Sequence, residues 1–278
     1  MRNTGGAPAL PLPTVSSMRT HGTVRTADGT EVAYQLDGPG PPLLLLAGQA
    51  NNHHWWDAVR ADLLAYRTLS LDWRGTGDSE DGTSDFTTRT LAADVVTLLD
   101  QLGIETLDVY GTSMGGRVAQ WLAVDHPGRV RRLVLGCTTP GGPRAVERSQ
   151  DVRRRLAVAD PVAAREAVAD LMYTPGWRAT HPGPYATLGD PAISAVSARR
   201  HLRASARHDA YDVLPRIAAP TLVLHGTDDE FAPVVNARLI ADRIPDATLR
   251  LFEGARHAYF EECRPEASQV VLEFLAAG

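Results

Sequence analysis

The chain has 278 residues, 44% of them hydrophobic, so it is long enough to bury a large core and to carry an accessory lobe. Its formal net charge of −5 argues against a nucleic acid or an anionic membrane surface as its partner. All 28 basic residues are arginine, and the absence of lysine excludes Schiff-base chemistry.

Residues 1 to about 18 are rich in Gly, Pro and Ser, and we predict that they form a mobile tail. They lack the apolar stretch of a signal peptide, and no apolar run approaches the roughly 20 residues of a membrane span. The two cysteines, Cys137 and Cys263, form neither a disulfide framework nor a metal-ligand spacing. These features predict a cytoplasmic protein, and they leave open whether it is a monomer or a homo-oligomer.

After this tail, two predicted strands at 21–26 and 31–36 flank an Asp28-Gly29 turn, which is typical of an antiparallel hairpin. Apolar runs then alternate with helical patterns, as in a mostly parallel sheet that is covered by helices on both faces. These predicted strands lie at 43–46, 68–71, 106–110 and 130–135, and the helices at 55–64, 88–102 and 114–125. Strands at 221–224 and 248–252 complete an eight-stranded α/β sheet, and a final helix follows at 265–275.

The segment 140–215 interrupts this alternation. It is rich in Arg and Ala, carries helical patterns such as 163–171, and has few strand signals. Its length greatly exceeds that of usual connections between a helix and a strand. We therefore predict a helical cap at 140–215, inserted into an α/β core formed by residues 19–139 and 216–278.

The pattern G-x-S-x-G occurs at Gly111-Thr-Ser113-Met-Gly115, directly between the predicted strand 106–110 and a helix. Such a context predicts a nucleophile elbow, in which small neighbours let the chain turn sharply and expose the serine hydroxyl. The amide of Met114 then lies at a helix N-terminus, where an unpaired N–H favours an anion. Ser113 is thus the predicted nucleophile, and Met114 supplies one oxyanion donor.

A nucleophilic serine needs a base and an acid that orients it, and both are expected downstream in the order Ser, Asp, His. His257 lies in a loop before the final helix and is the candidate base. Two adjacent carboxylates, Asp228 and Asp229, follow the strand at 221–224 on the same rim of the sheet. Reasoning from the residues alone does not separate these two acids.

The motifs together resemble those of α/β-hydrolase-fold enzymes, in the branch of small esterases, enol-lactonases and cofactor-free haloperoxidase-like proteins. The resemblance covers nearly the whole chain after about residue 20. Its motifs are Leu43-Leu-Leu-Leu-Ala-Gly48-Gln49, Asp72-Trp-Arg-Gly75-Thr-Gly77-Asp78-Ser79, Gly111-Thr-Ser113-Met-Gly-Gly116, Gly226-Thr-Asp-Asp229-Glu-Phe-Ala-Pro233 and Gly254-Ala-Arg-His257. In such families the acid sits three residues after the glycine, which implies Asp229. The resemblance also implies that no metal or organic cofactor is needed.

The first oxyanion loop departs from the family pattern, because Ala47-Gly48-Gln49 stands where His-Gly is usual. The hole is built from backbone N–H groups, so we expect the Gln49 amide to be its second donor, with Gly48 allowing close approach.

The predicted substrate pocket combines the patch that follows this loop with bulky side chains of the cap. The predicted pocket residues are Gly48, His53, His54, Trp55, Trp177 and Tyr185. Two adjacent histidines without a third ligand do not indicate a metal site.

These residues predict an enzyme that hydrolyses a small carboxylic ester or lactone. Ser113 excludes dehalogenase-like and epoxide-hydrolase-like chemistry, because those relatives need a carboxylate at this position. A perhydrolase or haloperoxidase-like enzyme would use the same residues with hydrogen peroxide. A carbon–carbon bond hydrolase is the next alternative, although its relatives carry tryptophan where this chain has Ala258. The alternative of another class is a small-molecule receptor that binds without turnover.

Overall fold

A single eight-stranded sheet forms the centre of the computed structural model, which describes residues 19–277. Its strand order is β1-β2-β4-β3-β5-β6-β7-β8. The strands are β1 Thr20–Arg25, β2 Glu31–Asp37, β3 Pro42–Leu46, β4 Arg67–Leu71, β5 Leu107–Thr112, β6 Val130–Gly136, β7 Thr221–Gly226 and β8 Ala247–Phe252. All eight strands predicted from the sequence are confirmed, whereas the predicted tail lies outside the described residues.

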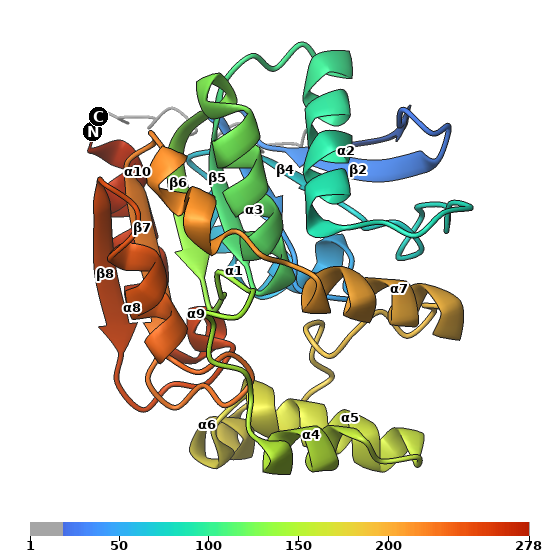
Figure 1. The fold of residues 1–278 in the computed structure, drawn as a ribbon, viewed down its shortest axis with the longest axis vertical. Coiled ribbons are helices and arrows are strands. Elements are labelled where there is room, and N and C mark those ends of the chain that lie inside the picture. The colour runs from blue at the N-terminus through green and yellow to red at the C-terminus, as the bar shows by residue number, and fades with distance from the viewer. Residues whose placement is uncertain (1–18, 278) are drawn as a thin grey trace, which may run out of the picture.

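The sheet is mixed at one end and parallel elsewhere. β1 pairs with β2, and β2 with β4, in antiparallel fashion, while the six strands from β4 to β8 in the sheet order run parallel. The carboxyl ends of these six strands therefore meet at one edge, at the bottom of Figure 1. Loops that leave parallel strands at this edge can bring distant residues together.

Helices cover both faces of the sheet, because alternate residues of the central strands point to opposite sides. Leu44 and Leu46 pack into one core with α2 and α3, whereas Leu43 and Leu45 pack into the other with α9 and α10. The helices are α1 Asp57–Arg60, α2 Thr88–Gln101, α3 Met114–Asp125, α4 Gln150–Leu156, α5 Pro161–Met172, α6 Pro175–Thr180, α7 Ala195–Ala206, α8 Val235–Ala241, α9 Tyr259–Glu262 and α10 Glu266–Ala276. None of these described helices is long and apolar enough to cross a membrane.

The helix predicted at 55–64 is broken into shorter turns. A 3₁₀ turn at His53–Trp56 precedes α1, and a second one at Ala61–Leu63 follows it. The Asn52 side chain accepts a hydrogen bond from the His54 N–H, and the Asp72 carboxylate accepts one from the His53 N–H. The start of the segment is therefore fixed against the loop after β4, which periodicity alone does not reveal.

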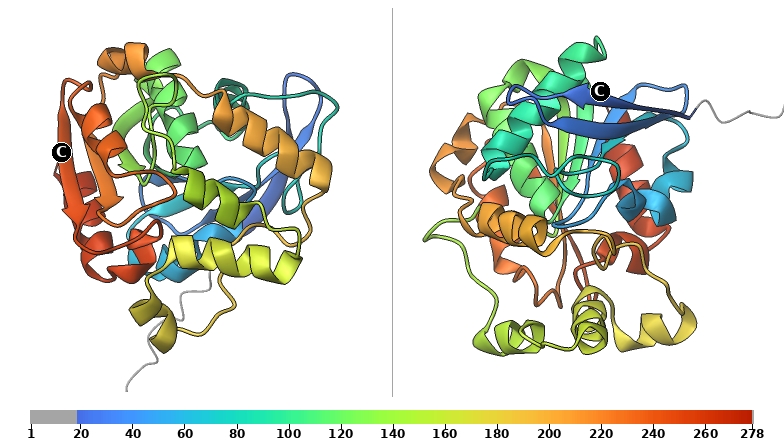
Figure 2. Two further views of the ribbon diagram at one scale, coloured as in Figure 1. Left: turned by 60° about the horizontal axis from the view of Figure 1, so that its bottom comes forward. Right: turned by 90° about the vertical axis from the view of Figure 1, so that its right-hand side faces the viewer.

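The helices α4 to α7 all lie between β6 and β7 in the chain. In Figures 1 and 2 they extend across the carboxyl edge of the sheet. The two ends of this insertion pair side by side, through an isolated bridge between Gly141 and Asp209. Four helices thus lie within residues 140–215, and the bridge joins two residues near the ends of that segment.

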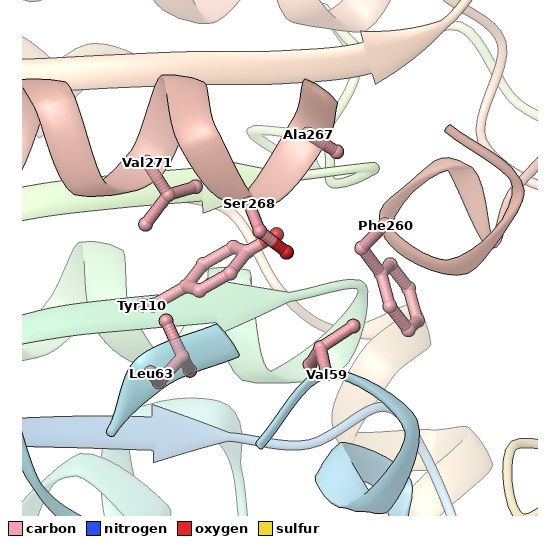
Figure 3. A pocket seen from close by; sticks show the side chains of 7 residues that line it. All are labelled: Val59, Leu63, Tyr110, Phe260, Ala267, Ser268 and Val271. Carbon is pink, nitrogen blue, oxygen red and sulfur yellow. The ribbon is translucent and has the colours of Figure 1, made fainter. Parts of the chain in front are cut away.

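A small void lies under α10, against the face of β5 (Figure 3). Its volume is about 10 Å³, which is room for one water molecule at most. Its lining residues are Val59, Leu63, Tyr110, Phe260, Ala267, Ser268 and Val271. This void is too small for an organic ligand.

Candidate active site

Ser113 lies at the turn between β5 and α3, with a backbone φ of 54°. This is the left-handed region, which non-glycine residues rarely adopt. The Ser113 N–H donates to Gly136 O at 2.9 Å, and Thr138 Oγ1 donates to Ser113 O at 2.7 Å. These two bonds to β6 and the loop after it hold the serine in its strained conformation.

The glycines of the motif are required by close packing around this turn. A Cβ on Gly115 would lie 2.1 Å from the carbonyl oxygen of Leu46, and one on Gly111 would lie 2.5 Å from Gly115 O. Both distances are far shorter than real Cβ contacts. Small residues therefore let α3 approach the end of β3 and bring Ser113 to the edge of the sheet.

His257 lies in the loop between β8 and α9, and its Nδ1 is 2.8 Å from Oδ2 of Asp229. Asp229 is 5% exposed and follows β7. Its Oδ1 accepts the Ala232 N–H at 2.9 Å, and its Oδ2 lies 3.0 Å from His225 Nε2. Every oxygen of this buried carboxylate thus has a partner.

The environment of Asp229 favours its ionised form. Burial opposes the charge, but interaction with His257 and hydrogen bonds from His225 and His257 outweigh it, so the pKa of Asp229 lies below its usual range. Asp228, by contrast, is exposed, and its side chain accepts a hydrogen bond from Thr227 Oγ1. The acid that contacts His257 is therefore Asp229, which the family resemblance favours over Asp228.

Ser113 and His257 line one cavity of about 360 Å³ at the carboxyl edge of the sheet. Gln49 and Met114, the predicted oxyanion donors, line it as well. Most of its remaining wall is apolar, and much of that wall comes from the inserted segment. These apolar residues are Trp55, Leu156, Val168, Met172, Leu188, Leu202 and Phe231. A pocket of this size and character accommodates a small organic molecule.

The backbone N–H groups of Gln49 and Met114 donate to no acceptor within residues 19–277.

The loop that carries Gln49 is fixed, although it has Ala47 where the sequence pattern usually has a histidine. Asn51 Nδ2 donates to Gln49 O at 2.8 Å, and Asn51 Oδ1 accepts the Gly189 N–H at 3.0 Å. Asn51 thus ties this loop to the inserted segment.

Two of the predicted pocket residues lie at the cavity wall or directly behind it. Trp55 lines the cavity, and its Nε1 donates to Thr112 Oγ1 at 2.9 Å. Gly48 lies against the Trp55 ring, since a Cβ there would be 2.6 Å from a ring carbon. Gly48 therefore allows the close approach that the sequence predicts, with an indole ring as the neighbour.

Four other predicted pocket residues, His53, His54, Trp177 and Tyr185, do not line this cavity. The imidazoles of His53 and His54 are bound by Asp72 and Asp57, each at 2.7 Å. 

The two aromatic residues of the insertion, Trp177 and Tyr185, pack together with Tyr173, and the Trp177 ring stacks on the Tyr173 ring at 4.5 Å. The Tyr173 hydroxyl donates to Glu261 of α9, and Trp177 and Tyr185 together line a surface hollow beside α1 and α9, apart from the cavity of Ser113. The pocket prediction for His53, His54, Trp177 and Tyr185 is therefore corrected, because none of them lines the cavity of Ser113 and His257.

Sequence reasoning missed several polar and aromatic residues around the site. Arg117, Arg148 and Phe231 line the cavity, and His225 contacts Asp229 from behind. A signal existed only for Arg117, the one charged residue in the first two turns of α3. The others come together through the three-dimensional packing of the loops and the insertion.

Ser113 lies in a strained turn and faces a cavity together with His257, which is bonded to the buried carboxylate of Asp229. This arrangement defines the protein class as a hydrolase on a mostly parallel α/β sheet. A family model described as the alpha/beta hydrolase fold matches residues 41–262, and the chain belongs to this family.

The similar proteins carry different activities in their names. The chain is 31% identical over 255 residues to the protein assigned in Variovorax paradoxus as the carbamate hydrolase RutD, covering 87% of this chain and 95% of that one. It is also 31% identical to the non-heme chloroperoxidase of Streptomyces lividans, over 85% of this chain and 92% of the relative. The crystal structure of the enol-lactonase from Burkholderia xenovorans is similar with a TM-score of 0.78 at 25% identity, covering 91% and 99% of the two chains.

Proposed function

We propose that the chain is a serine hydrolase that cleaves a carboxylic ester or lactone through an acyl-enzyme on Ser113. The observation that carries this proposal is the shared cavity of Ser113 and His257, together with the 2.8 Å contact between His257 Nδ1 and Asp229. A carboxylate that accepts Nδ1–H selects the tautomer in which Nε2 is free to act as a base.

The reaction has two halves. His257 takes the proton of Ser113 as Oγ forms a bond to the acyl carbon, and the same proton passes to the alcohol oxygen when the carbon–oxygen bond breaks. Water then attacks the acyl-enzyme, gives a proton to His257, and releases the acid as Ser113 recovers its hydrogen. In a lactone the alcohol and the acid remain parts of one product. Asp229 stays ionised throughout and stabilises the imidazolium.

The free N–H groups of Met114 and Gln49 would bind the oxyanion of each tetrahedral intermediate. The Met114 amide begins α3, so the helix dipole adds to its hydrogen bond. Since both donors are preorganised, they stabilise charge in the transition state more than in the ground state.

The inserted helices would serve as a cap over the cavity and select the substrate. Support comes from the share of the wall that residues between 148 and 205 contribute. The enol-lactonase of Burkholderia xenovorans supports a lactone or ester as the substrate class.

A perhydrolase activity is the second candidate, and the similarity to the non-heme chloroperoxidase favours it. It would use the same acyl-enzyme with hydrogen peroxide in place of water. Peroxide-dependent halogenation in the presence of a short carboxylic acid, measured beside ester turnover, separates the two activities.

The direct test is covalent labelling of the serine. A fluorophosphonate should modify one serine, and the adduct should map to the peptide with Ser113, while Ser113→Ala protein should remain unlabelled. The labelled protein should also lose its turnover of aryl esters. Intact-mass and peptide spectrometry supply the measurement. If Ser113 stays unmodified under conditions that label ordinary serine esterases, the non-catalytic receptor becomes the better explanation.

A further inference from the structure

The cavity that Ser113 and His257 share is positively charged on one side. Arg117 and Arg148 line it, and no Asp or Glu does. Within the described part of the chain, neither guanidinium lies within 4.0 Å of a carboxylate. Because a charged side chain that is largely removed from water is normally paired, these two half-buried arginines without a carboxylate partner require a reason.

Most hydrogen-bond donors of these side chains are unused. Arg117 Nη1 donates to Ser205 O at 2.6 Å, whereas its buried Nε has no partner among the described residues. The Arg148 side chain donates to no atom of that same part of the chain, and its guanidinium stacks 5.0 Å above the Phe231 ring. Ser205 also lines the cavity, and its buried Oγ has no partner there either.

The protein environment of Arg117 and Arg148 disfavours their positive charges. Burial and the charge of Arg148 lower the pKa of Arg117 to about 10, and burial likewise lowers the pKa of Arg148. Both shifts mean that the folded protein destabilises the guanidinium cations. An anion between them would supply hydrogen-bond acceptors and relieve this repulsion.

The two arginines lie beside the reacting groups. Arg117 follows Ser113 by four residues and thus sits about one turn into α3. The Arg148 guanidinium stacks on the Phe231 ring, and the same ring lies 5.1 Å from the His257 ring. Arg148 is therefore next to His257, with one side chain between them. A molecule that places its carbonyl at Ser113 can therefore extend a second group to this side of the cavity.

Charge balance indicates which group fits. Arg117 and Arg148 carry two positive charges, and the negative charges of Glu147 and Asp229 act on Arg148. Glu147 is exposed and pairs with Arg153 at 3.3 Å, which cancels its charge outside the cavity. Arg117, Arg148 and Asp229 therefore sum to one positive charge, which a monoanion neutralises. The planar guanidinium also matches the two oxygens of a carboxylate.

We propose that Arg117, Arg148 and the Ser205 hydroxyl bind a carboxylate of the substrate, so that the enzyme acts on a monoanionic ester or lactone. This inference rests on the proposed hydrolase function and names its substrate class. The formal charge of the whole chain, −5, repels such a substrate, so any preference for it must arise at the site.

The experiment compares substrates that differ in charge and share their shape. In the acyl series, mono-4-nitrophenyl adipate is paired with 4-nitrophenyl 6-methylheptanoate, in which an isopropyl group replaces the carboxylate. In the leaving-group series, 3-acetoxybenzoate is paired with 3-isopropylphenyl acetate. The charge preference is the ratio of kcat/KM for the anionic member to that for its neutral partner. We expect the wild type to favour the anionic member in at least one series by tenfold or more.

Substitutions then assign the preference to the subsite. Arg148→Met and Arg117→Met should each lower the ratio by about 10- to 100-fold, the effect of losing a hydrogen bond to a charged group. Ser205→Ala should lower it by several-fold. Arg154→Met removes a charge from the same segment. Among residues 19–277 its exposed side chain pairs only with Asp151, so the ratio should stay at the wild-type value.

Arg148 lies outside the helices, between β6 and α4, so its replacement tests the proposal even if Arg117→Met fails to fold. Equal or better turnover of the neutral members by the wild type in both series would overturn the inference. So would a ratio that Arg148→Met and Ser205→Ala leave unchanged. Failure of the proposed function itself looks different, because then no ester is turned over and Ser113 takes no label.

Discussion

His225 Nε2 lies 3.0 Å from Oδ2 of Asp229, the oxygen that also contacts His257. His225 is fully buried at the end of β7, and the same nitrogen donates to Ala232 O at 2.6 Å. One carboxylate oxygen is thus held between two histidines. His225 is a positioning residue in this arrangement, since it touches the acid and lines no part of the cavity.

Replacement of His225 by Phe should lower kcat by about tenfold, because Asp229 loses a donor that fixes it against His257. The pKa of Asp229 should rise as well. A depressed carboxylate pKa stabilises the fold above the unfolded value and loses this contribution as the pH falls through the folded value. The acid-unfolding midpoint of the variant should therefore move to higher pH. 

The readouts for His225→Phe are kcat and an acid unfolding titration. His54→Phe is the control, since this exposed imidazole contacts Asp57 and lies apart from Asp229. An unchanged acid midpoint would show that His225 supports only the packing of the loop.

Ser113→Ala and His257→Ala should each lower kcat by about 10⁴- to 10⁶-fold, and the double variant should lose little more, because the two residues act as one unit. Steady-state kinetics on an aryl ester, with thermal melts as the check on folding, provide the measurement. Additive losses would mean that the two residues act independently.

Asp229→Asn should lower kcat by about 10⁴-fold at neutral pH, because the amide favours the wrong imidazole tautomer while preserving shape. Asp228→Asn is the matched control, and it should retain nearly full activity, since Asp228 is exposed. Similar losses in the two variants would contradict the geometry of the loop after β7.

Gly115→Ala should prevent folding or destabilise the protein by about 3 kcal/mol or more, because the new Cβ meets the backbone oxygen of Leu46. Gly176→Ala, in α6, provides the control, since nothing lies within 4 Å of its Cβ position. That variant should be as stable as the wild type or slightly more so. Soluble yield and chemical unfolding distinguish the two, and equal stability would exclude close packing as the reason for the glycine.

Glu261, on α9, accepts a hydrogen bond from the Tyr173 hydroxyl at 2.9 Å, and burial raises its pKa to about 7. A carboxylate with a raised pKa keeps its proton longer in the folded state than in the unfolded state. Its contribution to stability is therefore full below the unfolded pKa of 4.5 and is lost as the pH rises through about 7.

Glu261→Gln should remove this dependence. Between pH 5 and pH 8 (about the span of the shift), the free energy of unfolding of the wild type should fall relative to the variant by at most about 3 kcal/mol. Glu273→Gln, an exposed change on α10, should parallel the wild type. Urea unfolding at several pH values measures the difference, and parallel curves for Glu261→Gln and the wild type would refute it.

The sequence was informative wherever a local rule forces the structure. Continuous apolar runs predicted the strands, and the strand, glycines and helix around Ser113 predicted a turn that the structure has at φ 54°. Asp229 and His257 follow strands whose carboxyl ends share an edge, although only the resemblance to a known family separated Asp229 from its neighbour Asp228. The remaining features depend on contacts between distant segments.

The pocket wall shows this limit most clearly. Trp177 and Tyr185 are bulky residues of the insertion, yet their partner is Tyr173 and not the cavity. Arg148 reaches the cavity only because Phe231, from the loop after β7, packs beneath it. Composition and periodicity describe how a segment folds, but they do not state which face of the insertion meets the core.

The two halves of the cavity are encoded in separate stretches of the chain. Ser113, His257, Gln49 and Met114 belong to the core, whereas most of the opposite wall comes from residues 148–205. Exchanging that stretch for the one of a relative should therefore redirect substrate choice with the chemistry intact. Arg117 is the exception, since it would stay behind in α3. A chimaera would keep Arg117 but lose Arg148, so it would carry half of the positive charge on the anion-binding side. Arg117 is therefore the residue to change together with the exchanged stretch.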